Sequence, residues 1–367
     1  MVSNELPQTR VSLAGVGRGW PETLVKRAVR MAAEGATDFS WLSRGDAVFI
    51  KPALNSGNPY PATTRPEAVA AMVELLQEKG AGRVIVGDMS GIPFFKMTPE
   101  RLFGSTRRLM ERCGMAQAAR EAGAELHFFE EAGWNGFYEE APISGSHWKR
   151  GLMMPKVLKE VEHIILLPRC SRHALSGSTL GLKAAVGYWR TDTRLEYHQD
   201  AATLQEKTAE GNTGTTLLRK QRLVLSAADK VLATCGPNRG YVSHPETGLI
   251  IASESVVAHD MVSLAWLLKN RRHTRESARG KILDPYQSQF LVALINRLVV
   301  GRLGGCRPAL ASQKLARNDI ETIWDDRVLN RAYQVFGRIP RVLLKAANET
   351  LPAELKNELT EMIIPSA

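Results

Sequence analysis

Three side chains that can exchange protons or bind metals lie close together in the sequence. His173, Lys183 and His198 fall within residues 168–200, a segment rich in Gly, Ser and Thr that follows the apolar run EHIILLP. Open α/β sheets bind their ligands in loops that leave the carboxyl ends of buried strands. An amine and two imidazoles that converge there could transfer protons, ligate a metal or bind an anion.

Lys183 is the first candidate catalytic residue. Its neighbours from Gly181 to Gly187 are small or apolar, and burial among them would lower the pKa of the amine. A lysine of lowered pKa can act as a nucleophile or a general base. The alternative is a structural lysine that pairs with a carboxylate such as Asp88 or Asp260.

The two histidines have different predicted roles. His173 follows a strand end, where an imidazole could exchange protons as the second catalytic residue, or could satisfy a loop hydrogen bond. His198 could ligate a metal with a neighbouring carboxylate orienting its ring, or could lie at the surface. Asp88 ends the run RVIVGD and is the second candidate metal ligand, although it could also bind a ribose or Lys183.

A further set of side chains could hold an anionic substrate. Cations and hydroxyls beside flexible backbone suit a carboxylate or a phosphate. The set comprises Lys51, Asn55, Thr64, Arg65, Ser176 and Thr179. The alternative is that prolines and glycines merely shape the loop after residue 52, and that SGST is an ordinary cap and turn.

Strand and helix patterns alternate along the chain. Apolar runs predict strands at 46–52, 83–88, 125–130, 162–168, 230–236 and 247–253. Helical patterns cover 64–80, with Thr64 as N-cap, and 99–123, 154–161, 217–228 and 255–270, the last capped by Ser253 or Ser255. After Lys281 strand patterns vanish and helical ones continue.

The alternation predicts an α/β fold with two Rossmann-like halves, mainly parallel sheets and a helical C-terminal extension. The expected domains are an N-terminal half at 1–145, a second half carrying the His/Lys segment at 146–283, and the extension at 284–367. The helical extension is compatible with a homodimer.

Composition restricts the class of protein. The chain has 367 residues, 44% hydrophobic content and a net charge of +10. The apolar runs are too short for a membrane span and no signal peptide is visible, so we expect a cytoplasmic protein with no membrane partner. Four scattered cysteines predict neither a zinc site nor an intrinsic iron–sulfur cluster. No G-x-S-x-G, H-E-x-x-H or Walker motif is present.

Several blocks resemble the domain-of-unknown-function 362 family. They are VFIKPALNSG, TTRPEAVAAMVELLQEKGAGRVIVGDMSG, LKEVEHIILLPRCSRHALSGSTLGLKAAVG and GLIIASESVVAHDMVS, in the family's order. The resemblance implies an α/β fold with Rossmann-like halves. The chain departs from the family pattern at Ala53, at Arg169–Cys170 and at Ala184, where that family usually has an amide or a basic run.

The His/Lys/His order is also similar, more faintly, to the nickel-pincer lactate racemase family. That resemblance implies that Lys183 carries the pincer cofactor, His198 ligates nickel and His173 moves protons. TTRPE matches that family's substrate-binding Thr-Arg pair at Thr64 and Arg65. The family's other catalytic His has no counterpart, because the run DMSG stands in that region.

The sequence therefore predicts an enzyme that acts on a small anionic molecule, by redox or isomerisation chemistry, in a cleft between the two halves. A metal or a metal-containing organic cofactor is compatible with this site. One alternative is a non-catalytic carrier of a metal or cofactor. The other is a nucleic-acid-binding or scaffold protein that uses the basic C-terminal third, with its densest cationic stretch at 269–281; the absence of known motifs disfavours nucleic acid.

Overall fold

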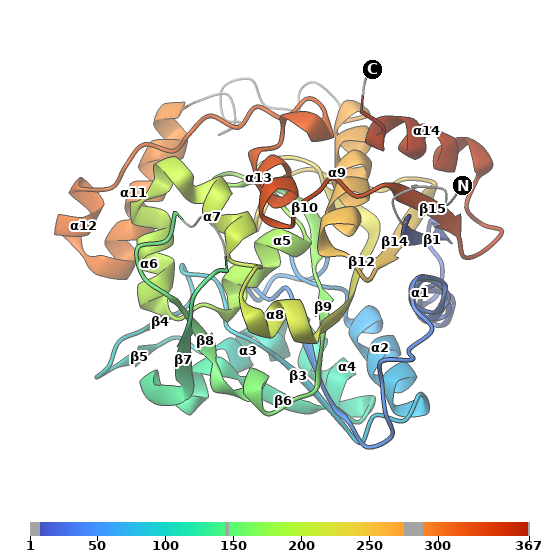
Figure 1. Cartoon of the computed structure of the whole chain (residues 1–367), viewed down its shortest axis with the longest axis horizontal. Helices are drawn as coiled ribbons and strands as arrows, with labels where there is room; N and C mark the ends of the chain where they lie inside the picture. Colours follow the sequence, from blue (N-terminus) through green and yellow to red (C-terminus); the bar gives the residue numbers. More distant parts are fainter. Residues whose placement is uncertain (1–7, 144–146, 275–288, 366–367) are drawn as a thin grey trace, which may run out of the picture.

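The apolar runs of the sequence pair side by side in the computed structural model, which describes residues 8–143, 147–274 and 289–365. They form a mostly parallel eleven-stranded sheet whose main order is β15-β1-β14-β12-β9-β2-β3-β6 (Figure 1). Two further sheets of two strands each pair β4 with β5 and β7 with β8. The strands are β1 Thr9–Gly17, β2 Ala47–Pro52, β3 Arg83–Asp88, β4 Lys96–Met97, β5 Leu102–Phe103, β6 Glu125–Phe128, β7 Phe137–Glu140, β8 Leu152–Pro155, β9 His163–Leu167, β10 Arg169–His173, β11 Gly177–Thr179, β12 Gln221–Leu232, β13 Val242–Ser243, β14 Thr247–Ser253 and β15 Val342–Ala346.

Helices cover both faces of this sheet. They are α1 Glu22–Ala36, α2 Pro66–Glu78, α3 Thr106–Arg112, α4 Met115–Glu121, α5 Gly181–Ala184, α6 Thr191–Gln199, α7 Leu204–Glu210, α8 Thr215–Lys220, α9 Val256–Arg272, α11 Gln289–Gly304, α12 Cys306–Leu310, α13 Arg327–Val335 and α14 Ala353–Ile363. Residues of α1, α2 and α4 share one apolar cluster with Ile50 and Val86, whereas neighbouring Phe49 and Ile85 join a cluster on the other face. The predicted mixed α/β architecture with a helical C-terminal region is confirmed.

The first three predicted strands and β9 form a parallel part of the sheet, in the order β9-β2-β3-β6, with β6 at the edge. Strand β2 pairs with β3 on one side and with β9 on the other, so that Lys51 lies opposite Leu166 and Pro52 opposite Leu167. This pairing joins strands from both predicted halves within one sheet. The carboxyl ends of β2, β3 and β9 consequently meet at one edge, as parallel pairing requires.

The prediction of a helix over 217–228 is wrong beyond residue 220. Helix α8 ends at Lys220, and the twelve-residue strand β12 begins at Gln221 and ends at Leu232, so it includes only the first part of the strand predicted at 230–236. Leu223 to Ala228 are buried on both faces, and a continuous apolar run fits a central strand as well as a buried helix. The predicted helix at 154–161 is likewise replaced by the end of β8 and a single 3₁₀ turn.

The C-terminal region contains a strand that the sequence does not predict. Strand β15 pairs in parallel with β1 at the edge of the sheet, from Thr9 opposite Val342 to Leu13 opposite Ala346. Only Leu344 of β15 is buried, so this short edge strand lacks the apolar run of a central strand. The expectation of helices alone after Lys281 is therefore corrected; Lys281 itself lies outside the described residues.

Two predicted caps have different outcomes. Ser255 caps α9, because its hydroxyl accepts the N–H of Ala258 at 3.2 Å. Thr64 does not cap α2: its hydroxyl accepts the N–H of Ala53 at 2.8 Å and donates to the carbonyl of Leu167 at 2.5 Å. Thr64 thus ties the loop after β2 to the end of β9. No helix among residues 8–143, 147–274 and 289–365 is long and apolar enough to cross a membrane.

The close pairing of β3 and β6 depends on Gly87. A Cβ at this position would lie 2.1 Å from the carbonyl oxygen of His127 and 2.9 Å from the Phe49 ring. Because the sheet backbone cannot withdraw cheaply, Gly87→Ala should lower the free energy of unfolding by about 2–3 kcal/mol, as measured by urea denaturation. In the control Gly301→Ala, the nearest contact of the new methyl is Ala309 at 3.7 Å, and stability should be kept or increased. Equal stability of Gly87→Ala and the wild type would contradict this packing.

Candidate functional site

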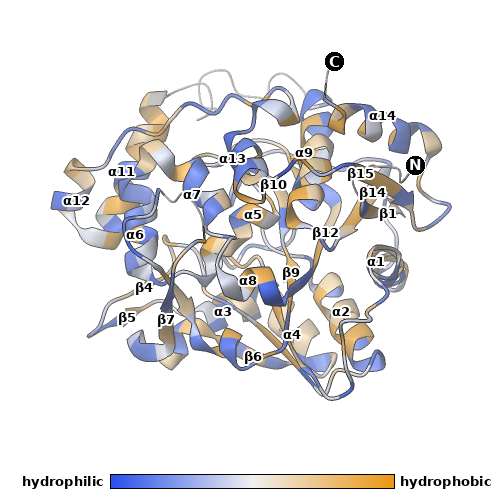
Figure 2. Ribbon diagram, viewed as in Figure 1, coloured by the Kyte–Doolittle hydropathy of each residue, from blue (hydrophilic) through white to orange (hydrophobic). Residues whose placement is uncertain are grey.

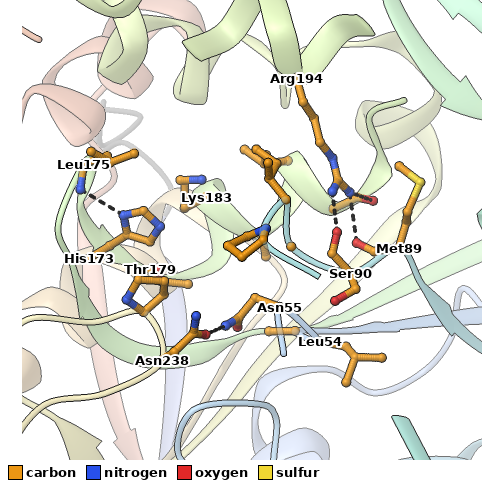
Figure 3. A pocket seen from close by; sticks show the side chains of 18 of the residues that line it. Leu54, Asn55, Met89, Ser90, His173, Leu175, Thr179, Lys183, Arg194 and Asn238 are labelled. Carbon is orange, nitrogen blue, oxygen red and sulfur yellow. Dashed lines mark hydrogen bonds between the residues drawn. The ribbon is translucent and has the colours of Figure 1, made fainter. Parts of the chain in front are cut away.

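A cavity of about 220 Å³ lies where the central strands end. Its polar lining comes from β2, β3, β10, β11, α5 and α6, and α11 adds Ile295 and Val299 (Figure 3). All three predicted segments of the chain therefore contribute to one site. Of the predicted site residues, the cavity brings together Lys51, Asn55, Asp88, His173, Thr179, Lys183 and His198.

Three predicted substrate-binding residues do not line this cavity. Arg65 forms an ion pair with Asp229, contacts Glu67 at 3.1 Å and lies over the Tyr60 ring. The Thr64 hydroxyl is hydrogen-bonded to the backbone of the loop after β2 and to the backbone of β9. The Ser176 hydroxyl donates to the carbonyl of Ser178 at 2.9 Å. Each of these three side chains makes contacts within the loops around the site.

The Lys183 amine has a lowered pKa, as the sequence predicts. Burial lowers the pKa of Lys183 to about 7, with further lowering by the positive charges of Arg194 and Arg169. Its Nζ lies 5.1 Å from the centroid of the Tyr197 ring. Across the described ranges we find no hydrogen bond or ion pair to this Nζ, so the predicted alternative of a carboxylate-paired lysine is not observed. About half of the amine is neutral at pH 7.

The backbone under Lys183 is held by Asp260. The Asp260 carboxylate accepts the N–H of Gly181 at 2.8 Å and the N–H of Leu182 at 2.7 Å. These two N–H groups stand at the start of α5, where a helix offers them no acceptor of its own. His259 contacts the same carboxylate through Nδ1 at 2.8 Å. The buried acid within the 255–270 helix therefore acts as a cap that positions the lysine.

His173 is held in one tautomer. Its Nδ1 accepts the backbone N–H of Leu175 at 3.1 Å and that of Ser176 at 3.4 Å, so the ring proton resides on Nε2 (Figure 3). Burial, with the charges of Lys183 and Arg169, moves the pKa of His173 well below its ordinary value. His173 is thus a neutral hydrogen-bond donor, and the expectation that it exchanges protons near neutral pH is not supported.

His198 carries the opposite tautomer. The Asn296 amide donates to the carbonyl of His198 at 2.8 Å, which leaves its Oδ1 to accept the Nδ1 proton of His198 at 3.1 Å. The Nε2 lone pair is then free of a proton. Burial, and then the charge of Lys183, lower the pKa of His198 to about 3. This imidazole is a neutral acceptor at physiological pH.

Two buried arginines complete the site. Arg194 donates to the carbonyls of Met89 at 2.9 Å and Gly187 at 3.0 Å, and also to Ser90, while burial lowers its pKa to about 10. Arg169 donates to the carbonyls of Ala62 and Pro237. The sequence around Arg194 is compatible with an exposed charged loop or with a substrate contact, whereas the structure buries this side chain in α6. The signal that could have found it is its spacing from His198, four residues later on one face of α6.

Lys51 and Asp88 form a buried ion pair of 2.9 Å at the ends of β2 and β3. The Asp88 carboxylate also accepts the N–H of Leu54 at 2.9 Å and of Met89 at 2.8 Å. Gly187 permits this approach, because a Cβ there would lie 2.4 Å from the Lys51 amine. Asp88, a predicted metal ligand, is therefore fully engaged by donors.

The charges of the cavity wall favour an anion. Lys51, Lys183, Arg169 and Arg194 line it, and Asp88 is the one carboxylate among its described lining residues. The buried hydroxyl of Thr179 also has no hydrogen-bond partner within the described ranges. The buried amine of Lys183 and the hydroxyl of Thr179 therefore carry a desolvation cost that an anionic ligand would reduce.

A metal fits this wall less well. Within residues 8–143, 147–274 and 289–365 no three His, Cys, Asp or Glu side chains gather as a metal site. His198 offers one imidazole acceptor, but Asp88 is engaged and the surrounding cations would repel a divalent ion. The donor set thus does not match the expected metal or nickel cofactor.

The fold and the site define a mixed α/β protein with a cationic cavity at the strand ends. The chain belongs to the family described as "Domain of unknown function (DUF362)", whose sequence model matches residues 48–265. The predicted family resemblance is confirmed. A curated relative is the thylakoid-associated protein sll1697 of Synechocystis sp., 28% identical over 228 residues; the match spans 61% of this chain and 63% of that protein's length.

Two solved structures show more distant similarity. A protein from Thermotoga maritima has a TM-score of 0.39 and 10% identity, covering 59% of this chain and 52% of its own. The lactate racemase apoprotein from Thermoanaerobacterium thermosaccharolyticum has a TM-score of 0.37 and 13% identity, covering 68% and 56%. Neither likeness bears on the reaction of this chain.

The lowered pKa of Lys183 can be measured directly. In the NMR spectrum of protein with isotope-labelled lysine, the signal that disappears in Lys183→Met should titrate with a midpoint near pH 7. Exposed Lys149, whose pKa is raised by Asp200, is the internal reference and should not titrate below pH 10. A Lys183 midpoint at the ordinary value of 10.5 would refute the buried, unpaired amine.

The same shift makes folding stability depend on pH. Between about pH 7 and 10.5 the unfolded chain binds more protons at Lys183 than the folded chain does. The free-energy penalty of burying the charged amine is therefore full below about pH 7 and is lost as the pH rises to 10.5. Lys183→Met should raise the free energy of unfolding by on the order of 2 kcal/mol at about pH 6, with the gain shrinking at alkaline pH. Exposed Lys345→Met is the control, without this pH dependence. A gain that is constant with pH would show that charge burial is not its cause.

Proposed function

We propose that this protein is an isomerase-type enzyme that moves a proton on a small carboxylate bound in the cavity. The main support is the amine of Lys183, which can lose its proton near neutral pH because its pKa is about 7. It lies in a cavity whose cations outnumber its carboxylates. A base poised near neutral pH is what proton abstraction requires. The family membership supports the fold but does not identify a reaction, so the proposal rests on these residues.

The cations would hold the substrate carboxylate. Arg169 and Arg194 are fixed by backbone carbonyls, so they supply permanent positive charge without reorganisation. The Thr179 hydroxyl and the Nε2–H of His173 supply hydrogen bonds from the same wall. Lys51 adds positive charge that Asp88 partly neutralises.

Proton transfer by these residues balances without a second reactant. The neutral Lys183 amine takes a proton from the carbon next to the carboxylate, and the electron pair of the broken C–H bond moves onto the carboxylate oxygens. The Nε2–H of His173 donates a hydrogen bond to the developing charge. The Lys183 ammonium then returns a proton to the same carbon or, in a substrate with a carbon–carbon double bond next to that carbon, to the far end of the double bond, which shifts the double bond toward the carboxylate.

Solvent exchange of the abstracted proton tests this proposal. Short carboxylates that carry a hydrogen next to the carboxylate are incubated with the protein in heavy water, and loss of the C–H signal is followed by NMR. Lys183→Met should reduce exchange by about a thousandfold and His173→Phe by about a hundredfold. Exposed Lys345→Met is the control and should keep full activity.

The pH profile supplies a second readout. Because only the neutral amine accepts a proton, exchange at limiting substrate should rise with pH and reach its plateau above about pH 7. No exchange with any such acid, together with tight retention of a small molecule by the natively purified protein, would favour the carrier function instead. Exchange that survives Lys183→Met would refute the role of the lysine.

A further inference from the structure

Helix α11 is apolar on two opposite faces. One face builds the site, since Asn296 bonds His198 and Ile295 and Val299 line the cavity. The other face leaves Phe290, Leu294 and Leu298 exposed at four-residue spacing, with 75% of Phe290 and 66% of Leu298 accessible to solvent. Residues at this spacing share one stripe of a helix. Figure 2 shows the apolar residues along α11.

The following short helix extends this exposed surface. Helix α12 packs against α11, and its last residue, Leu310, is 81% exposed. Both helices lie at one side of the molecule, away from β15 (Figure 1). Phe290, Leu294, Leu298 and Leu310 together are called the α11–α12 face. Clustered large apolar side chains on a surface indicate an interaction site.

The charge beside this face is entirely positive along the segment. Arg297, Arg302 and Arg307 are exposed, and the sequence from Pro285 to Asn318 contains no Asp or Glu. Within the described parts of the chain, no side-chain hydrogen bond or ion pair is found for these three arginines. Their guanidinium groups are therefore available to external anions such as phosphate.

We propose that the α11–α12 face docks the protein on the surface of an anionic lipid bilayer. A helical surface with large exposed apolar side chains and flanking exposed arginines suits the membrane interface, where the apolar groups reach the acyl boundary and the arginines meet lipid phosphates. Self-association through this face would set arginines of two copies against one another, with no acidic partner in the segment. This contact lies on the surface and requires no spanning helix.

The lipid contact is independent of the proposed reaction but lies next to its site. Leu294 and Leu298 point away from the core, while Ile295 and Val299, one residue further, line the cavity. A protein docked through this face would therefore hold one wall of the cavity close to the lipid surface. The test below measures binding alone, so its failure says nothing about proton transfer by Lys183.

Vesicle sedimentation tests the docking. The full chain should co-sediment with phosphatidylcholine vesicles that contain phosphatidylglycerol and remain in solution with phosphatidylcholine alone. The double variant Leu294→Glu/Leu298→Glu should lose binding at least about tenfold, because two apolar groups leave the acyl boundary. Arg297→Gln, Arg302→Gln and Arg307→Gln should each weaken binding by about fivefold and lower its sensitivity to salt.

Matched changes on the opposite side of the molecule serve as controls. Leu343→Glu on β15 and Arg338→Gln before it alter an exposed leucine and an exposed arginine elsewhere, and binding should be unchanged. Equal binding to neutral vesicles, no binding to anionic ones, or binding unaffected by both sets of substitutions would each overturn the proposal. A dimer that Leu294→Glu/Leu298→Glu dissociates, without vesicle binding, would identify the face as a self-contact and overturn it as well.

Discussion

The Asp88 carboxylate neutralises one lysine of the cavity and, among the described lining residues, there is no second carboxylate for the other cations. Its oxygens are taken by Lys51 and by two backbone N–H groups. Burial lowers the pKa of Lys183 most, and the positive charges of Arg194 and Arg169 lower it further. The acid–base character of the site follows from this imbalance between fixed cations and carboxylates.

The fold maintains this imbalance by giving each group a rigid support. Parallel pairing of β2 with β9 brings Lys51 and the chain entering β10 to the same edge of the sheet. Asp260 fixes the start of α5 beneath Lys183, and backbone carbonyls fix the guanidinium of Arg194. The two histidines are locked as a donor at His173 and an acceptor at His198, so neither competes with the lysine for protons near neutral pH.

Local patterns in the sequence predict the central strands, helix α9 and the lysine of the site, because these depend on apolar periodicity and on strand-end position. They do not predict which cations turn inwards. Arg65 precedes α2 and Arg194 lies within α6. The first pairs with Asp229 outside the cavity, while backbone carbonyls hold the second inside it. Asn296 orients His198 from a helix almost a hundred residues away, and no local pattern carries that contact. Strand β15 is not predicted for a related reason. Its own sequence lacks the apolar run of a central strand, and the strand forms by pairing with β1.

A purely structural role for Lys183 conflicts with the energetics of its surroundings. A lysine retained for stability would be paired, or replaced by an apolar residue of similar size, because an uncompensated buried amine destabilises the fold. The sequence provides two nearby acids, Asp88 and Asp260, but the structure directs one to Lys51 and the other to the backbone of α5. Keeping both carboxylates from the amine sustains its lowered pKa at a cost in stability. Strain of this kind is found where function requires it, and here it leaves an amine that an incoming carboxylate would satisfy.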